Sequence, residues 1–176
     1  QGVTDIHIDA ARRIAAIAPD RLVGLLERLT QVADISNHIN GLLTNLIENE
    51  IAIVSTGRLV AALLGSSELR DAAIPALVSL GSPAVTHVIP VLRDSDMIAR
   101  WSAVEVLGEI RDRSAVTPLL DLLYDPNKTV RNSTIEALGK IGDPIAIRHF
   151  ARLLNSDTAH EERFVISSQV IKALGY

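Results

Sequence analysis

Apolar residues recur along this chain at the three- and four-residue spacing of an amphipathic helix. Between residues 96 and 110 they fall within about 60° of one direction at 100° per residue. These apolar positions are Ala99, Ala103, Val106, Leu107 and Ile110. The period-two alternation and hairpin turns that mark β-strands are absent from the sequence. The pattern predicts helices over residues 5–17, 19–32, 35–47, 50–64, 68–80, 83–93, 96–110, 114–124, 126–141, 144–155 and 159–174.

The predicted helices repeat in pairs at a step of 31 residues. Leu107-Gly108 corresponds at this step to Leu138-Gly139, and Arg100 corresponds to Arg131. The repeat is clear over residues 56–176 and degenerate over residues 1–55. Two-helix units of this period bury their apolar faces only against neighbouring units. The sequence therefore predicts a single all-α domain over residues 1–176, an α-α superhelix (α-solenoid) of about five repeats of ~31 residues plus an N-terminal helix.

Cap residues, prolines and glycines mark the expected helix ends. A capping side chain followed by proline stands at Ser82-Pro83 and Asp143-Pro144, which predicts the start of the first helix of a unit, helix A. Asp125-Pro126 predicts the start of a second helix, helix B. Gly81 and Gly142 stand where a helix needs a residue with positive φ to end.

Two stretches of the sequence resemble HEAT repeats of the short, phycobilisome-lyase-like type. They are Asp125-Pro126-Asn127-Lys128-Thr129-Val130-Arg131 and Ala137-Leu138-Gly139-Lys140-Ile141-Gly142-Asp143-Pro144. The resemblance covers about the last 120 residues, and Arg111-Asp112-Arg113 stands in place of the family's usual Gly-Asp-Pro. It implies a HEAT-like α-solenoid. Members of that family include bilin lyase subunits, phycobilisome-degradation factors, a metal-dependent hydroxylase and many scaffolds.

Composition narrows the classes of function. The 176 residues include 17 Lys+Arg and 21 Asp+Glu, a net charge of −4, and only 3% aromatic residues. We therefore expect no nucleic-acid partner, because such proteins present a basic surface. The chain has no Cys, which excludes thiol catalysis and Cys-ligated zinc. No apolar run approaches the ~18 residues of a membrane-spanning helix. We expect a protein without a membrane span, located in the cytoplasm.

The histidines do not form a metal-ligating pattern. His87 and His149 align to the same point of helix A in units two repeats apart, a separation of roughly 20 Å. The hydroxylases of the resembling family carry His-Glu pairs just after a Val-Arg position, where this chain has Trp101-Ser102 and Asn132-Ser133. No metal, cofactor or catalytic residue is predicted. Whether the chain is an enzyme stays open, with the balance against it.

Arginines and aspartates recur at fixed positions of the repeat. Arg70, Arg100 and Arg131 occupy one position, and Asp94 and Asp125 precede the last two by six residues. One interpretation is an anion-binding ladder. The other is an Arg–Asp pair that closes the loop between helices A and B and stacks neighbouring units, which recurrence at a fixed repeat position favours.

A surface around the only Trp is the candidate binding site. With Ala103 at the centre of the buried face, Trp101 points ~160° away. Glu105 and Glu136 occupy equivalent positions on adjacent B helices, about 10 Å apart, and we interpret them as two solvated side chains on an open face. The candidate partner-binding residues are Met97, Ile98, Trp101, Glu105, Lys128, Thr129, Asn132, Glu136 and Lys140. The alternative is that Trp101 folds down over a neighbouring helix kinked by Pro75 or Pro90.

The sequence favours a scaffold for protein–protein interaction that holds a protein or peptide partner on the concave surface of the B helices. The alternative is a bilin lyase-like enzyme subunit or a tetrapyrrole-binding protein. The last predicted unit is apolar almost all round, although terminal repeats need a polar outer face. We therefore expect a second copy of the chain or an adjacent domain to cover the C-terminal end.

Overall fold

The computed structural model describes residues 21, 24, 25, 28, 56–67, 69–154 and 163–173, and within them every regular element is a helix. The elements, with 3-10 helices written η, are α4 (Thr56–Gly65), α5 (Arg70–Leu80), α6 (Ser82–Val88), η1 (Ile89–Arg93), α7 (Met97–Ile110), η2 (Arg113–Ala115), α8 (Val116–Asp121), η3 (Leu122–Tyr124), α9 (Lys128–Ile141), α10 (Pro144–Leu154) and α11 (Arg163–Ala173). The helices predicted over 5–17 and 35–47 lie outside the described residues. The four described residues of the predicted helix 19–32 are helical.

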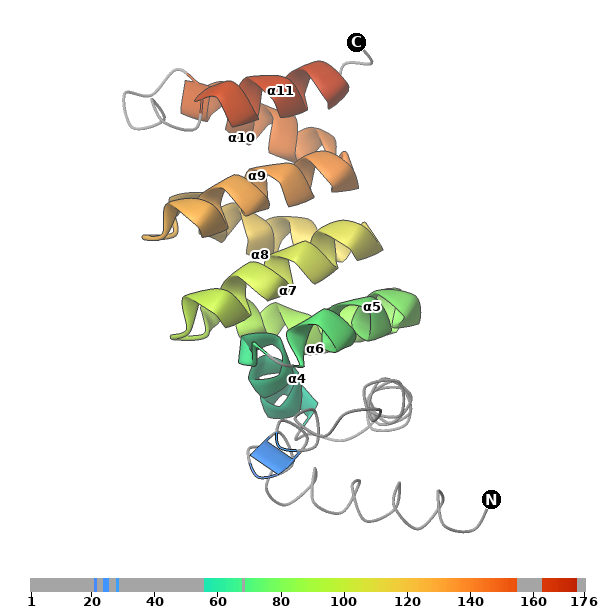
Figure 1. Ribbon diagram of the computed structural model, residues 1–176. Coiled ribbons are helices and arrows are strands. Elements are labelled where there is room, and N and C mark those ends of the chain that lie inside the picture. The colour runs from blue at the N-terminus through green and yellow to red at the C-terminus, as the bar shows by residue number, and fades with distance from the viewer. Residues whose placement is uncertain are drawn as a thin grey trace.

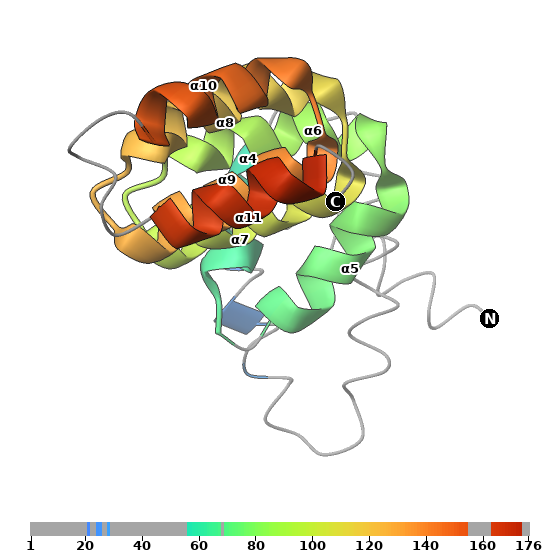
Figure 2. The ribbon, with the colours of Figure 1, turned by 90° about the horizontal axis from the view of Figure 1, so that it is seen from above.

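The helices stack in two layers, which Figure 1 shows along the length of the stack and Figure 2 from above. The A layer contains α6–η1, α8–η3 and α10, and the B layer contains α7, α9 and α11. The pair α4 and α5 packs on α6 and α7 at the N-terminal end of these layers. The predicted all-α solenoid is confirmed by this arrangement.

Apolar side chains directed inward from the two layers form one continuous core. The largest of the fully buried ones are Leu63, Leu64, Leu69, Leu77, Leu107, Leu119 and Phe150. Ser102 on α7 is also buried, and its hydroxyl donates to the carbonyl oxygens of Ile98 at 2.8 Å and Leu64 at 3.1 Å. The single hydroxyl proton is shared between the two carbonyls, so the buried serine joins α7 to the end of α4 with its donor satisfied.

Two of the three predicted cap-plus-proline starts are wrong. Asp143 does cap α10, since its carboxylate accepts from the backbone N–H of Ile145. The start of α9 is capped instead by Asn127, because the carboxylate of Asp125 is held by Arg100 and by the N–H of Asn127 itself. Ser82 is the first residue of α6 rather than its cap, and its side chain hydrogen-bonds Asp112.

The predicted glycine stops are confirmed, and an arginine provides a third. Gly81 with φ 65° ends α5, and Gly142 with φ 70° ends α9. At the equivalent end of α7 stands Arg111, with φ 57° and ψ 28°. Among the described residues other than glycine, Arg111 alone has a positive φ.

The helix A segments show where proline changes the backbone. The predicted helix 83–93 divides into α6 and η1, with Pro90 in the first turn of the 3-10 part. Proline lacks an N–H and clashes with the preceding turn, which explains a change of helix type at this position. Pro75, by contrast, lies inside α5, which is assigned as α-helix from Arg70 to Leu80.

Candidate functional site

The B helices α7 and α9 pack most extensively against each other, and Gly108 on α7 lies directly against Ala137 on α9. A Cβ atom built on Gly108 would lie 2.8 Å from the Cβ of Ala137 and 3.0 Å from its Cα. Real Cβ atoms essentially never lie within 3.0 Å of an atom such as the Cβ of Ala137. The missing side chain of Gly108 therefore sets the distance between the two helices.

We call the line of contact between α7 and α9 the α7–α9 seam. A pocket of about 130 Å³ lies on it. From α7 it is lined by Trp101, Glu105 and Gly108. From α9 it is lined by Ser133, Glu136, Ala137 and Lys140. The structure thus brings together four of the nine candidate residues, one aromatic and three charged, around a floor of small residues.

Trp101 forms a wall of this pocket and contacts three successive units. Its side chain is half-buried and packs against the core. Its indole N–H donates to the hydroxyl of Ser133 on α9 at 2.9 Å. On the other side, the guanidinium carbon of Arg70, at the start of α5, lies 5.5 Å from the ring centroid, the geometry of a cation–π contact. The indole is therefore fixed in one orientation from both sides.

The two carboxylates of the pocket differ, which corrects the expectation that both are solvated. Glu136 is exposed, but Glu105 is half-buried. The Oε2 atom of Glu105 is buried and has no hydrogen-bond partner among the described residues. The reason is that Glu105 lies on the seam between α7 and α9 rather than on an open face.

Lys140 does not neutralise Glu105. Its ammonium nitrogen lies 2.7 Å from Oε1 of Glu109, outside the pocket. The hydrogen bond from Lys140, followed by its positive charge, lowers the pKa of Glu109 below the ordinary value for glutamate. Two carboxylates and one ammonium therefore line the pocket, and because the ammonium is paired with Glu109, the pocket keeps a net negative charge.

The other five candidate residues lie outside the pocket. Met97 and Ile98 are half-buried in the first turn of α7, and Lys128 and Thr129 are exposed in the first turn of α9. Asn132 is half-buried, and its Oδ1 is a second buried oxygen without a partner among the described residues.

Sequence reasoning missed the residues that shape the pocket. Ser133 and Ala137 carry no chemical signal in the sequence, because their importance depends on how closely α9 approaches α7. Arg70 was identified only as a repeat position, and its contact with Trp101 departs from the repeat. A glycine recurring at the same repeat position, at Gly108 and Gly139, was the available signal of close helix packing.

Two of the three recurrent arginines, Arg100 and Arg131, close their own loops, and Arg100 also stacks the next unit, which confirms the favoured interpretation for these positions. Arg100 donates from Nε and Nη2 to the two carboxylate oxygens of Asp125 in the next unit, at 2.8 and 3.1 Å. Its Nη1 donates to the carbonyl oxygens of Asp94 and Ser95 in its own loop. Arg131 repeats the loop contact through the carbonyls of Asp125 and Pro126. The guanidinium donors of Arg100 that an anion would need are used within the protein.

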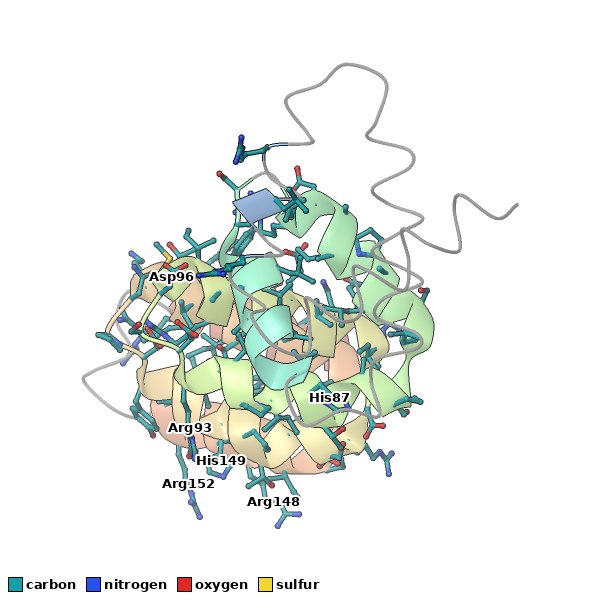
Figure 3. All side chains as sticks on the ribbon, turned by 90° about the horizontal axis from the view of Figure 1, so that it is seen from below. His87, Arg93, Asp96, Arg148, His149 and Arg152 are labelled. Carbon is teal, nitrogen blue, oxygen red and sulfur yellow. The ribbon has the colours of Figure 1, made fainter. Side chains whose placement is uncertain are left out.

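The A layer presents a different surface. Arg148 and Arg152 extend outward from α10 (Figure 3). A wider hollow of about 430 Å³ lies between η1 and the α8–η3 segment, with Arg93 and Asp121 among its mostly apolar walls. None of its described side chains has a buried polar atom without a partner. It therefore defines no ligand chemistry as clearly as the seam pocket does.

The described residues include no group of three or more His, Cys, Asp or Glu side chains placed to hold a metal ion. His87 on α6 and His149 on α10 lie two repeats apart, with α8 between them (Figures 1 and 3). In the same part of the chain, each helix is too short or too polar to pass through a bilayer.

Comparisons with known proteins agree with this architecture. A family model described as HEAT repeats matches residues 85–175, slightly more than half of the chain. Human deoxyhypusine hydroxylase in complex with glycerol is similar in structure, with a TM-score of 0.51 and 20% identity over 97% of this chain and 67% of that one. An engineered protein gives a TM-score of 0.49 and 18% identity over 97% of this chain and 90% of that one. At 20% identity the likeness to the hydroxylase concerns the fold alone. No curated protein sequence matches the chain.

Proposed function

This chain belongs to the family of HEAT repeats, and from that premise we propose that it is a scaffold that binds a segment of a protein partner on the α7–α9 seam. Solenoids of stacked helix pairs bind partners along extended surfaces formed by successive repeats. The seam is such a surface, since it is built from equivalent helices of two neighbouring units.

The observation that carries this proposal is the pocket beside Trp101. Small-molecule sites typically enclose roughly 300–1,000 Å³, whereas this pocket has about 130 Å³, the room for one side chain rather than a cofactor. An aromatic wall with charged groups around it is also the composition of a protein-binding hot spot. These features support a peptide segment that places one side chain in the pocket and lies along the seam.

The finer expectations remain proposals. We also propose that the repeats are of the short, phycobilisome-lyase-like type, which the 31-residue step supports. No observation on the described residues favours tetrapyrrole binding. The absence of a nucleic-acid partner and the cytoplasmic location stay predictions. A contact at the C-terminal end is supported by Phe164 and Ile171 on α11, whose side chains are 85% and 51% exposed.

Selection from a library of random linear peptides displayed on phage tests the scaffold proposal. Trp101 is the only Trp of the chain, so its emission reports on the pocket without a label. We expect selected peptides to bind the purified protein in calorimetry and to shift the Trp101 emission. Glu136→Ala, on the exposed rim of the pocket, weakens their binding.

The matched control is Arg93→Ala, which removes an exposed charged side chain from the A layer. It leaves peptide binding unchanged while the circular-dichroism spectrum confirms folding. The proposal is overturned if no peptide binds, or if the selected peptides bind without changing Trp101 emission and without responding to Glu136→Ala.

A further inference from the structure

The buried oxygen of Glu105 is the least satisfied group of the seam pocket. A carboxylate oxygen out of contact with water ordinarily accepts hydrogen bonds from the protein, because an unpaired buried charge is costly. Oε2 of Glu105 has no such partner among the described residues, and the Glu105 side chain lines a pocket. The group is therefore arranged to accept hydrogen bonds from something outside the described chain.

The donors nearest to Glu105 are engaged elsewhere. The indole N–H of Trp101, one helical turn before it, donates to Ser133. The ammonium of Lys140 is paired with Glu109 at 2.7 Å. The guanidinium of Arg70 lies over the ring of Trp101. Among the described residues these groups leave no free donor for Glu105, which favours a donor supplied by a ligand.

The charge of the pocket selects the kind of donor. Glu105 and Glu136 are equivalent residues on adjacent repeats, and both line the pocket. Lys140 also lines the pocket, but its charge is paired with Glu109, so the two carboxylates leave a net negative charge that repels an acidic ligand and attracts a cation. The indole of Trp101 offers a flat wall on which a guanidinium or an aliphatic lysine stem can lie.

We propose that the seam pocket takes a basic side chain of the partner, arginine or lysine, whose cationic group donates hydrogen bonds to Glu105. This inference rests on the proposed function and names the partner's chemistry: the bound segment is cationic at the residue that enters the pocket. Glu136 contributes a second negative charge at the rim, and Trp101 fixes the plane of the bound group.

The test compares Glu105→Gln with Asp121→Asn. Both variants remove one negative charge, but Asp121 lies on α8 in the other layer. The probes are peptides selected against the wild-type protein, each also synthesised with every arginine replaced by neutral citrulline and every lysine by norleucine. We expect the selected peptides to be rich in Arg or Lys. Glu105→Gln weakens their binding by about tenfold or more, the loss of a charged hydrogen bond, while Asp121→Asn does not.

Binding of the neutral peptide is already weak and is not weakened further by Glu105→Gln, since the two changes remove the same interaction. Thermal unfolding of the free variant gives a second readout. Replacing a carboxylate that has one buried oxygen without a partner raises the Tm of Glu105→Gln by about 1–3 °C. A fall in Tm shows that Glu105 has a partner within the protein and overturns the inference.

The outcomes separate the inference from the proposed function. Two results overturn the proposal of a basic side chain but not the scaffold proposal. In the first, the peptides shift Trp101 emission but lack basic residues. In the second, they bind Glu105→Gln as tightly as Asp121→Asn. Peptides that bind without any response of Trp101 or of the pocket variants overturn both. The same holds when no peptide binds at all.

Discussion

Arg100 and Asp125 join two successive repeats through a two-point ion pair, with Nε donating to Oδ2 at 2.8 Å and Nη2 to Oδ1 at 3.1 Å. The side chains are 12% and 5% exposed. The hydrogen bonds with Asp125 raise the pKa of Arg100 above its ordinary value, so the guanidinium stays charged. Because Arg100 also holds the carbonyls of its own loop, one guanidinium closes a loop and stacks the next unit on it.

Asp125→Asn tests how much this pair stabilises the stack. It leaves the positive charge of Arg100 half-buried without its carboxylate, and breaking a buried pair in this way costs about 3 kcal/mol. Urea unfolding followed by circular dichroism measures the loss. The control is Asp71→Asn, whose carboxylate lies 3.6 Å from Arg70 but is 85% exposed. An exposed pair contributes about 0–1 kcal/mol, so equal losses in the two variants contradict the prediction.

Gly108→Ala tests the close approach of α7 and α9. The added methyl group meets the Cβ and Cα of Ala137, and since backbone must move, we expect a loss of about 1–3 kcal/mol in unfolding free energy. Ala137→Gly removes one of the two clashing atoms. The double variant therefore loses less unfolding free energy than the sum of the two single variants. The difference is the coupling free energy, measured by urea unfolding. Strict additivity of the two losses contradicts a direct contact.

The helical stack was predictable because it depends on local pattern. The periodicity of apolar residues and the 31-residue step gave the described helices from α5 onward to within a few residues. The helix ends failed where a tertiary contact competes with a local one. Asp125 and Ser82 look like caps in the sequence, but Arg100 and Asp112 engage their side chains.

The candidate site was predictable only in part, for a related reason. The direction of Trp101 on its helix follows from the helical period, and it led to Glu105, Glu136 and Lys140, which share its pocket. The burial of Glu105 and the hydrogen bond from Trp101 to Ser133 depend on the distance between two helices. That distance depends on the absence of a side chain at Gly108, which the apolar periodicity of the helix does not reveal.

Arg111→Gly is expected to stabilise the protein. Arg111 is exposed and holds φ 57°, a conformation that costs an L-residue about 1–2 kcal/mol and glycine almost nothing. Glycine is also more flexible in the unfolded chain, which leaves a net gain of about 0.5–1 kcal/mol. Arg113→Gly, two residues on, removes the same charge where φ is not positive, and it should lower stability. Thermal and urea unfolding of the two variants compare them directly.

The stability of the protein should fall in acid partly through Asp112. A hydrogen bond from the Ser82 side chain, together with the backbone N–H and hydroxyl of Ser114, lowers the pKa of Asp112 below its ordinary value. A carboxyl group whose pKa is lower in the folded state stabilises that state above its unfolded pKa, about 3.9. The contribution is lost as the pH falls through the folded value, when the proton removes the acceptor.

Melting temperatures from neutral pH down to pH about 2 measure this loss, in the range where aspartates titrate. We expect Asp112→Asn to be less stable than wild type at neutral pH and to lose less stability in acid, so that the two curves converge at low pH. Ser82→Ala removes the largest cause of the shift and should move the curve in the same direction. The control is Ser79→Ala, whose hydroxyl donates to the carbonyl of Ala76 within α5. Because that bond does not involve a carboxylate, its removal lowers the melting temperature by the same amount at every pH. If Ser82→Ala behaves like Ser79→Ala, Ser82 does not act on the charge of Asp112, and the contact between the start of α6 and the end of α7 must stabilise the stack by other means.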